Sequence, residues 1–294
     1  MSATTQGDRR NVTEAFLADR AKFVRLETVR LTKIAGAGHY SSTFSAAELF
    51  AALYYAELNI RPHEPDWPDR DRFILSKGHA AIGLYPILAD LGYFDKALLE
   101  EYTRLGSPFG DHPDMKKIPG ADFSSGSLGH GLSVGVGMAL AARVQRRKHR
   151  VFCMLGDGEL NEGQVWEAAM SAGHFGLQSL VGIVDRNGLC IDGHTEEIMS
   201  VEPLEQRFGS FGWDVQRIDG HDLNAILETF GKLKPPGEGK PQMIIADTVK
   251  GRGVKMMEMS LNWHVGNLVG RDYDAVVKEI QLGPDAVMRP GAGL

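Results

Sequence analysis

Cysteine is scarce in this chain of 294 residues, which has only Cys153 and Cys190. Neither has a second cysteine nearby in the sequence, so CxxC zinc and redox motifs are excluded. Such usage is typical of a reducing compartment. Segment 1–10 also lacks the apolar core of a secretory leader, and no apolar run reaches the ~18 residues of a membrane span. These features predict a cytoplasmic protein with no membrane partner.

An excess of basic charge is missing as well. The chain carries 32 Lys and Arg against 38 Asp and Glu, a formal net charge of −6. Nucleic-acid binding usually draws on a basic surface, so no nucleic-acid partner is expected. The one basic run, residues 146–150, lies between a helical pattern and an apolar strand. We interpret it as a solvated helix end.

Glycine, by contrast, is abundant. There are 35 glycines, about 12% of the chain against a usual ~7%. Many of them lie in short clusters between periodic segments. This placement indicates tight turns, or backbone that approaches a ligand closely.

The apolar pattern predicts helices in the first part of the chain and a strand–helix alternation in the second. Ser45 and Glu48 have the spacing of a helix capping box. We expect strands at 72–75, 151–155, 180–184, 213–218 and 242–247, and helices at 16–35, from 45 onward, and at 80–91, 96–105, 132–147, 164–174, 201–209 and 223–230. This order predicts an α/β fold with a doubly wound, mainly parallel sheet and helices on both faces.

The domain organisation is expected to be simple. We predict a flexible N-terminal segment over 1–12, a single domain over 13–282 and a loose tail over 283–294. In a sheet of this type, ligands bind at the carboxyl ends of the strands.

Polar residues follow two of the expected strands where each strand ends. Asp157 stands between two glycines after 151–155, and Asn187 follows 180–184. The spacing leaves room for one helix and one strand, so both residues should return to the same edge of the sheet. With the backbone carbonyl of Leu189 they offer three oxygen ligands. A diphosphate and water would complete the coordination of Mg²⁺ or Ca²⁺.

Nearby glycines support an anion at this edge. Gly158 would let backbone N–H groups approach phosphate oxygens. The glycine-rich run 126–131 opens the helix before strand 151–155, and a helix N-terminus is a natural anion site. Each motif alone is ordinary, because Gly-Asp-Gly and Asp-x-Asn-Gly are common turns. The combination at this spacing is more specific.

The combined motifs resemble the thiamine diphosphate signature, and the chain resembles the N-terminal, diphosphate-binding half of transketolases. The resemblance extends from about residue 20 to 270, in family order. SKGHA and GSLGHG are more diagnostic than GDG, which many thiamine diphosphate enzymes share. The matching stretches are AGHYSSTFSAAEL, DRFILSKGHAAIGLY, GDHPD, GSLGHGLSVGVGMAL, GDGELNEGQVWEAA, DRNGLCIDG and DTVKGRGV.

The resemblance implies a role for each matched residue. Asp157, Asn187 and the Leu189 carbonyl would hold the metal. Gly158 and His79 would contact the diphosphate. The other implied cofactor contacts are backbone groups of Gly126 and Leu128 at the aminopyrimidine, and Glu162, which would support the cofactor-activating carboxylate of the other half.

The resemblance also implies that four histidines surround the reacting carbon: His39, His79, His112 and His264. The cofactor provides an electron sink for the carbanion. A hydroxyl proton of the sugar must leave and later return, and an imidazole can both take it and give it back. The other histidines are interpreted as surface or satisfied polar residues. Two loops differ from the usual family pattern: Gly38-His39-Tyr40-Ser41 replaces Gly-His-Pro-Gly, and Trp263-His264-Val265-Gly266 replaces Trp-His-Gly.

The chain stops before the pyrimidine-binding module of a full transketolase. We therefore expect a separate partner subunit of similar size, two copies of each subunit, and ketol transfer between sugars only when both are present. The alternatives are a specialised split transketolase of secondary metabolism, or another thiamine diphosphate lyase or transferase. A dehydrogenase of the E1 type shares GDG and the Asn, but SKGHA and GSLGHG disfavour it. From another class, the chain could be a non-catalytic, cofactor-binding regulatory subunit.

Overall fold

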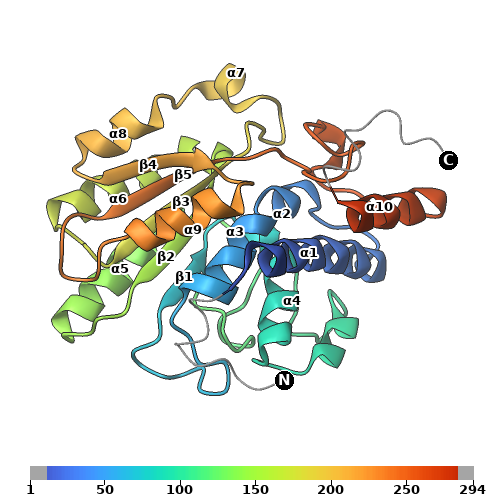
Figure 1. Cartoon of the computed structure of the whole chain (residues 1–294), viewed down its shortest axis with the longest axis horizontal. Helices are drawn as coiled ribbons and strands as arrows, with labels where there is room; N and C mark the ends of the chain where they lie inside the picture. Colours follow the sequence, from blue (N-terminus) through green and yellow to red (C-terminus); the bar gives the residue numbers. More distant parts are fainter. Residues whose placement is uncertain (1–11, 284–294) are drawn as a thin grey trace.

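Five parallel strands form the central sheet of the computed structural model, which describes residues 12–283 (Figure 1). Their order is β1-β2-β3-β5-β4, and every neighbouring pair is parallel. The strands are β1 (Arg72–Leu75), β2 (Val151–Gly156), β3 (Leu180–Arg186), β4 (Asp214–Asp219) and β5 (Gln242–Asp247). The predicted α/β class is confirmed. The predicted flexible segment and tail lie almost wholly in 1–11 and 284–294, outside the described residues.

Helices cover both faces of the sheet because successive strand side chains point to opposite sides. In β2, Phe152 and Met154 pack in one buried cluster, while Cys153 and Leu155 pack in the other. One face carries α1 (Glu14–Ala35), α3 (Ala47–Ala52), α4 (Ala81–Leu91) and α9 (Leu223–Lys232), and the other carries α5 (His130–Val144), α6 (Gly163–His174) and α8 (Leu204–Ser210). Strands buried on both faces explain the continuous apolar runs in the sequence.

A third cluster lies beside α1, where α10 (Arg271–Leu282) packs (Figure 1). This helix was not predicted. Its apolar residues Tyr273, Val276, Val277 and Ile280 do recur at helical spacing and could have indicated it. The remaining short helices are α2 (Ser41–Ser45) and α7 (Thr195–Met199).

The predicted capping box at Ser45 is wrong. The helix is interrupted at Ala46, and the Ser45 hydroxyl donates to Asp185 at 2.7 Å instead of capping a helix. The expected helix 96–105 is a shorter 3₁₀ turn, Lys96–Glu101. The basic run is also not a simple solvated helix end, because Arg150 pairs with Glu57 and Asp71.

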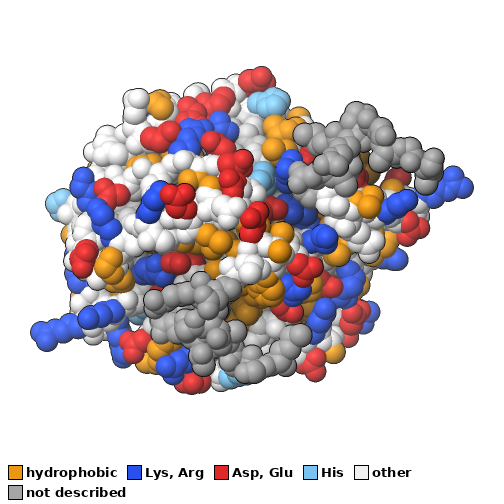
Figure 2. Space-filling model, viewed as in Figure 1, with side chains coloured by type: hydrophobic (Ala, Val, Ile, Leu, Met, Phe, Trp, Pro, Cys, Tyr) orange, Lys and Arg blue, Asp and Glu red, His pale blue; other side chains and the backbone are white. Residues whose placement is uncertain are grey.

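On the face shown in Figure 2, Lys and Arg side chains are interspersed with Asp and Glu rather than gathered into one basic field. Within residues 12–283, none of the helices has both the length and the apolar character that a membrane crossing requires.

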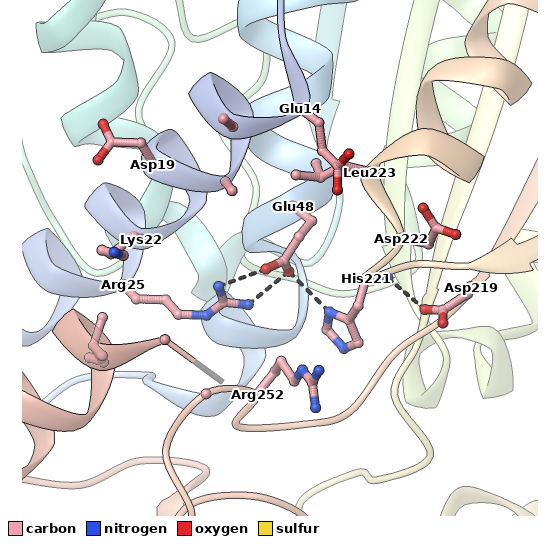
Figure 3. A pocket seen from close by; sticks show the side chains of 15 residues that line it. Glu14, Asp19, Lys22, Arg25, Glu48, Asp219, His221, Asp222, Leu223 and Arg252 are labelled. Atoms are coloured by element: carbon pink, nitrogen blue, oxygen red, sulfur yellow. Dashed lines mark hydrogen bonds and ion pairs between the residues drawn. The ribbon is translucent and has the colours of Figure 1, made fainter. Parts of the chain in front are cut away.

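A buried ionic network joins α1 and α3 to two loops at the carboxyl edge of the sheet (Figure 3). Arg25 binds both carboxylate oxygens of Glu48 at 2.7 Å, and Glu48 accepts from His221 Nδ1 at 3.0 Å. The other ring nitrogen of His221 accepts the Val249 N–H at 2.8 Å. Arg25, Glu48 and His221 border a cavity of about 750 Å³. Although burial by itself raises the pKa of Glu48, Arg25 and His221 lower it to about 2.

Replacing Glu48 by Gln is expected to lower the free energy of unfolding by about 3 kcal/mol, because Arg25 is left buried without its counter-charge. Urea unfolding at pH 7 measures this. The matched control is Glu64→Gln, which removes the exposed pair with Arg61 and should have a much smaller effect. Equal effects of the two substitutions would contradict the assignment.

The same pair predicts a pH dependence. The unfolded Glu48 takes up its proton near pH 4.5 and the folded one only near pH 2. The stabilisation of the fold by ionised Glu48 is therefore complete above about pH 4.5 and is lost as the pH falls toward 2. Over that window, Glu48→Gln should show a shallower loss of stability than the unsubstituted protein. An identical slope would argue against the pair.

Candidate functional site

The two predicted metal-binding segments lie side by side. Strands β2 and β3 are neighbours, and Gly156 stands opposite Asp185 in their register. The Gly188 N–H donates to the Asp157 carboxylate at 2.6 Å, and the Asp157 N–H donates to the Asp185 carbonyl at 3.2 Å. The structure thus brings Asp157 to the turn 187–189, at the carboxyl edge where the sequence predicted their meeting.

The predicted ligand atoms all take part in local hydrogen bonds. Asp157 also accepts from Gly158 N–H at 2.9 Å and from Arg186 at 3.1 Å. The Asn187 side-chain oxygen accepts the Leu189 N–H at 3.2 Å. Burial, and then the neighbouring Asp185, raise the pKa of Asp157. A carboxylate in these surroundings gains stability from additional positive charge.

Asp185 was not singled out from the sequence, yet it is fully buried at the centre of this edge. It accepts hydrogen bonds from the ammonium of Lys77, the hydroxyls of Ser45 and Thr248, and the amide of Asn187. Although burial by itself raises the pKa of Asp185, Lys77 above all, and then the hydroxyls of Thr248 and Ser45, lower it. The sequence feature that could have indicated Asp185 is its position at the carboxyl end of the apolar run of β3.

Lys250 is a second buried cation that sequence reasoning missed, although it stands in the quoted stretch DTVKGRGV. It is 2% exposed. Its ammonium donates to the Leu189 carbonyl at 2.8 Å, and no carboxylate of residues 12–283 pairs with it. Burial, and then Lys77, lower the pKa of Lys250 to about 8. A buried ammonium without a carboxylate partner is costly, so this position favours an anionic ligand.

These residues fit a metal ion with a diphosphate. The carboxylate, amide and carbonyl oxygens are the donors that Mg²⁺ and Ca²⁺ prefer. Lys77 and Lys250 supply positive charge for an anion beside them. In addition, the hydroxyls of Ser42 and Ser125 and the Nδ1 atom of His264 are buried and have no hydrogen-bond partner among residues 12–283. Unsatisfied groups of this kind indicate that a ligand or water binds beside them.

The four histidines that the resemblance implied are brought together from four separate segments. The ring of His39 lies 5.2 Å from His79, 5.5 Å from His264 and 6.5 Å from His112. Burial, and then Lys77, lower the pKa of His79 well below its usual value. Burial, and then Lys250, lower the pKa of His264 to about 4. His79 and His264 are therefore neutral at pH 7.

The two loops that depart from the usual family pattern pack against each other. Gly38 and Gly266 form an antiparallel bridge with hydrogen bonds of 3.0 and 3.1 Å. The Ser41 hydroxyl donates to the Trp263 carbonyl at 3.0 Å, and the Tyr40 and Trp263 rings lie 6.1 Å apart. The two altered segments thus form one unit, which sets His39 beside His264.

The glycine-rich loop lies between the histidines and the Gly-Asp-Gly turn. Gly126 has a φ of +151°, and a Cβ added there would lie 3.4 Å from the His112 ring. Leu128, the other backbone contact expected in this loop, is half-buried. Glu162 is exposed and packs its side chain against Gly129.

Glu159, which was not predicted, ties this loop to the metal-binding turn. Its buried carboxylate accepts the N–H groups of Gly129 at 2.7 Å and Gly156 at 3.1 Å, together with the Ser76 hydroxyl. The resemblance implied a role for Glu162 in the same stretch, whereas the inward position of Glu159 is visible only in the fold.

Comparison with known proteins identifies the family to which this site belongs. Residues 17–288 match the family described as transketolase, thiamine diphosphate binding domain. The chain is 42% identical over 265 residues to one of the subunits of a 6-deoxy-6-sulfo-D-fructose transketolase from Clostridium sp. (strain MSTE9), covering 90% of this chain and 96% of that protein. It is 38% identical over 256 residues to one of the subunits of an apulose-4-phosphate transketolase from Phocaeicola vulgatus, covering 87% and 90%.

Solved structures agree with this assignment. A transketolase from Campylobacter jejuni superposes with a TM-score of 0.85 at 29% identity, covering 93% of this chain and 44% of that one. The chain thus spans less than half of a full-length transketolase. The family match over nearly the whole chain, together with this fold, shows that the protein belongs to the transketolase family, as a thiamine diphosphate-binding domain of a transketolase-type transferase.

Proposed function

We propose that this chain is the thiamine diphosphate-binding subunit of a split transketolase, which transfers a two-carbon ketol unit from a ketose to an aldose. The observation that carries this proposal is the meeting of Asp157 with the turn 187–189 beside the buried Lys250. Two relatives that are matched over nearly their whole length are themselves named as transketolase subunits. Their names support a separate partner subunit for this chain.

In this proposal, Asp157, Asn187 and the Leu189 carbonyl hold Mg²⁺ or Ca²⁺. Gly158 and His79 contact the diphosphate, and we add Lys77 and Lys250 to that group because both are buried cations beside it. Since the Lys250 ammonium already engages the Leu189 carbonyl, we propose that it turns to the diphosphate when metal and cofactor bind. Backbone groups of Gly126 and Leu128 are proposed for the aminopyrimidine.

The bound cofactor would supply the electron sink for breaking and forming the C–C bond. The residues of this chain would orient the sugar and move its protons. His79 and His264, which are neutral at pH 7, suit hydrogen bonding to the sugar and cofactor. His39 and His112 are the proposed acid–base pair. Glu162, which is exposed, is proposed to meet the partner subunit and to support its cofactor-activating carboxylate.

The partner subunit would carry the pyrimidine-binding module, and two copies of each chain are proposed. The named substrates of the two relatives carry a sulfo or a phosphate group. We therefore propose a sugar substrate with an anionic terminal group, which includes the specialised sugars of secondary pathways. A cytoplasmic location remains part of the proposal.

Binding of the cofactor tests the metal site. Calorimetry of thiamine diphosphate with the chain and its partner subunit should show binding that requires Mg²⁺ and is abolished by a chelator. Asp157→Ala should weaken it by at least about 100-fold, because loss of an outer-shell partner alone costs about 10- to 100-fold and here a direct ligand is lost. Asp214→Ala is the control, since Asp214 opens β4 at the opposite edge of the sheet. Unchanged binding by Asp157→Ala would contradict the site.

Turnover tests the split-enzyme proposal. Ketol transfer should appear only when this chain is mixed with a pyrimidine-module subunit, because the activating carboxylate is expected on that subunit. Full turnover by this chain alone would refute the need for a partner. Metal-dependent cofactor binding without turnover in the mixture would favour the regulatory alternative.

A further inference from the structure

Asp111 places a carboxylate against the histidine cluster. Its two oxygens lie 3.3 and 3.2 Å from Nδ1 of His39, and one lies 3.9 Å from Nδ1 of His112. The hydroxyl of Tyr102 lies 3.5 Å from the same carboxylate. Asp111 belongs neither to the proposed metal ligands nor to the proposed cofactor contacts, yet it touches both proposed acid–base histidines.

The loop that carries Asp111 is held in place by hydrogen bonds from neighbouring residues, including one from the core. The Tyr85 hydroxyl donates to the Gly110 carbonyl at 2.9 Å, and the Thr103 N–H donates to the Phe109 carbonyl at 2.8 Å. Both Tyr85 and Tyr102 are fully buried. Burial raises the pKa of Tyr102, so its hydroxyl keeps its proton and can donate to Asp111. The carboxylate is therefore fixed toward the histidines.

The hydrogen-bonding chemistry determines the state of His39. Burial alone would raise the pKa of Asp111, but His39 above all, then His112 and Tyr102, lower it. An ionised carboxylate can only accept, so Nδ1 of His39 must carry the hydrogen. In the neutral ring, Nε2 then holds the free lone pair, and within residues 12–283 it makes no hydrogen bond.

The surrounding charges favour His39 over its neighbours as a proton carrier. The His79 and His264 rings face it at 5.2 and 5.5 Å, with the cations Lys77 and Lys250 close to them. His112 shares Asp111 from a greater distance. Of these four rings, His39 is the one with a carboxylate within hydrogen-bond distance, so a positive charge is stabilised best on His39.

We propose that Asp111 is a positioning residue that holds His39 in its Nδ1–H tautomer and thereby selects His39 as the base. This inference rests on the proposed function. Nε2 of His39 takes the proton of a substrate hydroxyl, Asp111 balances the resulting imidazolium, and the same proton returns in the second half-reaction. The arrangement follows the general logic of a carboxylate that orients a catalytic imidazole.

The tautomer can be measured on the folded chain alone, by the side-chain ¹H–¹⁵N correlations of its histidines. His39 should show the Nδ1–H pattern, and Asp111→Ala should abolish that preference. Asp114→Ala is the matched control, because Asp114 lies on the same loop but bonds to Lys116, Lys117 and Ser124 instead of a histidine. An Nε2–H pattern in the unsubstituted chain would overturn the proposal, whether or not the variant folds.

Kinetics with the partner subunit provide the second measurement. Asp111→Ala should lower kcat by about 10- to 100-fold, a part of the ~10²–10⁴ that general acid–base catalysis contributes, with little change in KM. An unchanged kcat in the folded variant would overturn the proposal. If the unsubstituted enzyme lacked ketol transfer altogether, the proposed function would fail, while the tautomer would still report on Asp111.

Discussion

The site depends on one buried carboxylate, that of Asp185. Its partners come from separate parts of the chain: Ser45 from the end of α2, Lys77 from the turn after β1, and Thr248 from the turn after β5. A fully buried charge is tolerated only when it is paired and hydrogen-bonded. Satisfying Asp185 therefore draws these segments to the end of β3. The turns that carry the metal-binding and histidine residues are positioned by that requirement.

The charges around Asp185 explain the proposed cofactor site. Asp157 and Asp185 lie close together, and burial together with Asp185 raises the pKa of Asp157. On the other side, Lys250 is buried without a carboxylate partner in the part of the chain that the structure describes. A divalent cation at Asp157 would stabilise its ionised carboxylate, and a diphosphate at Lys250 would pair with the buried ammonium. The polypeptide is thus arranged for a ligand that carries both signs of charge.

Much of the fold and the position of the metal-binding residues could be predicted, because the ends of the strands are visible in the sequence. The apolar runs indicated the strands, and their order placed Asp157 and Asn187 at one edge. The residues that were missed act through side-chain contacts between distant segments. Lys250, Glu159 and Asp111 have neighbours in space that no local pattern records.

The errors have the same physical origin. Ser45 has the local pattern of a helix cap, but its hydroxyl bonds to Asp185 because the buried carboxylate requires it. Glu159 was missed for a related reason, because it shares one turn with Glu162 and only the packed loop shows that the Glu159 carboxylate points inward. The unusual sequences around His39 and His264 likewise become intelligible together, through the bridge between Gly38 and Gly266.

The most direct test of the central claim is a crystal structure of the chain with its partner subunit, thiamine diphosphate and Mn²⁺, with anomalous scattering recorded for the metal. The account predicts one anomalous peak coordinated by Asp157, Asn187 and the Leu189 carbonyl, with the Lys250 ammonium moved from that carbonyl to the diphosphate. A bound cofactor whose metal lies away from these three oxygens would contradict it.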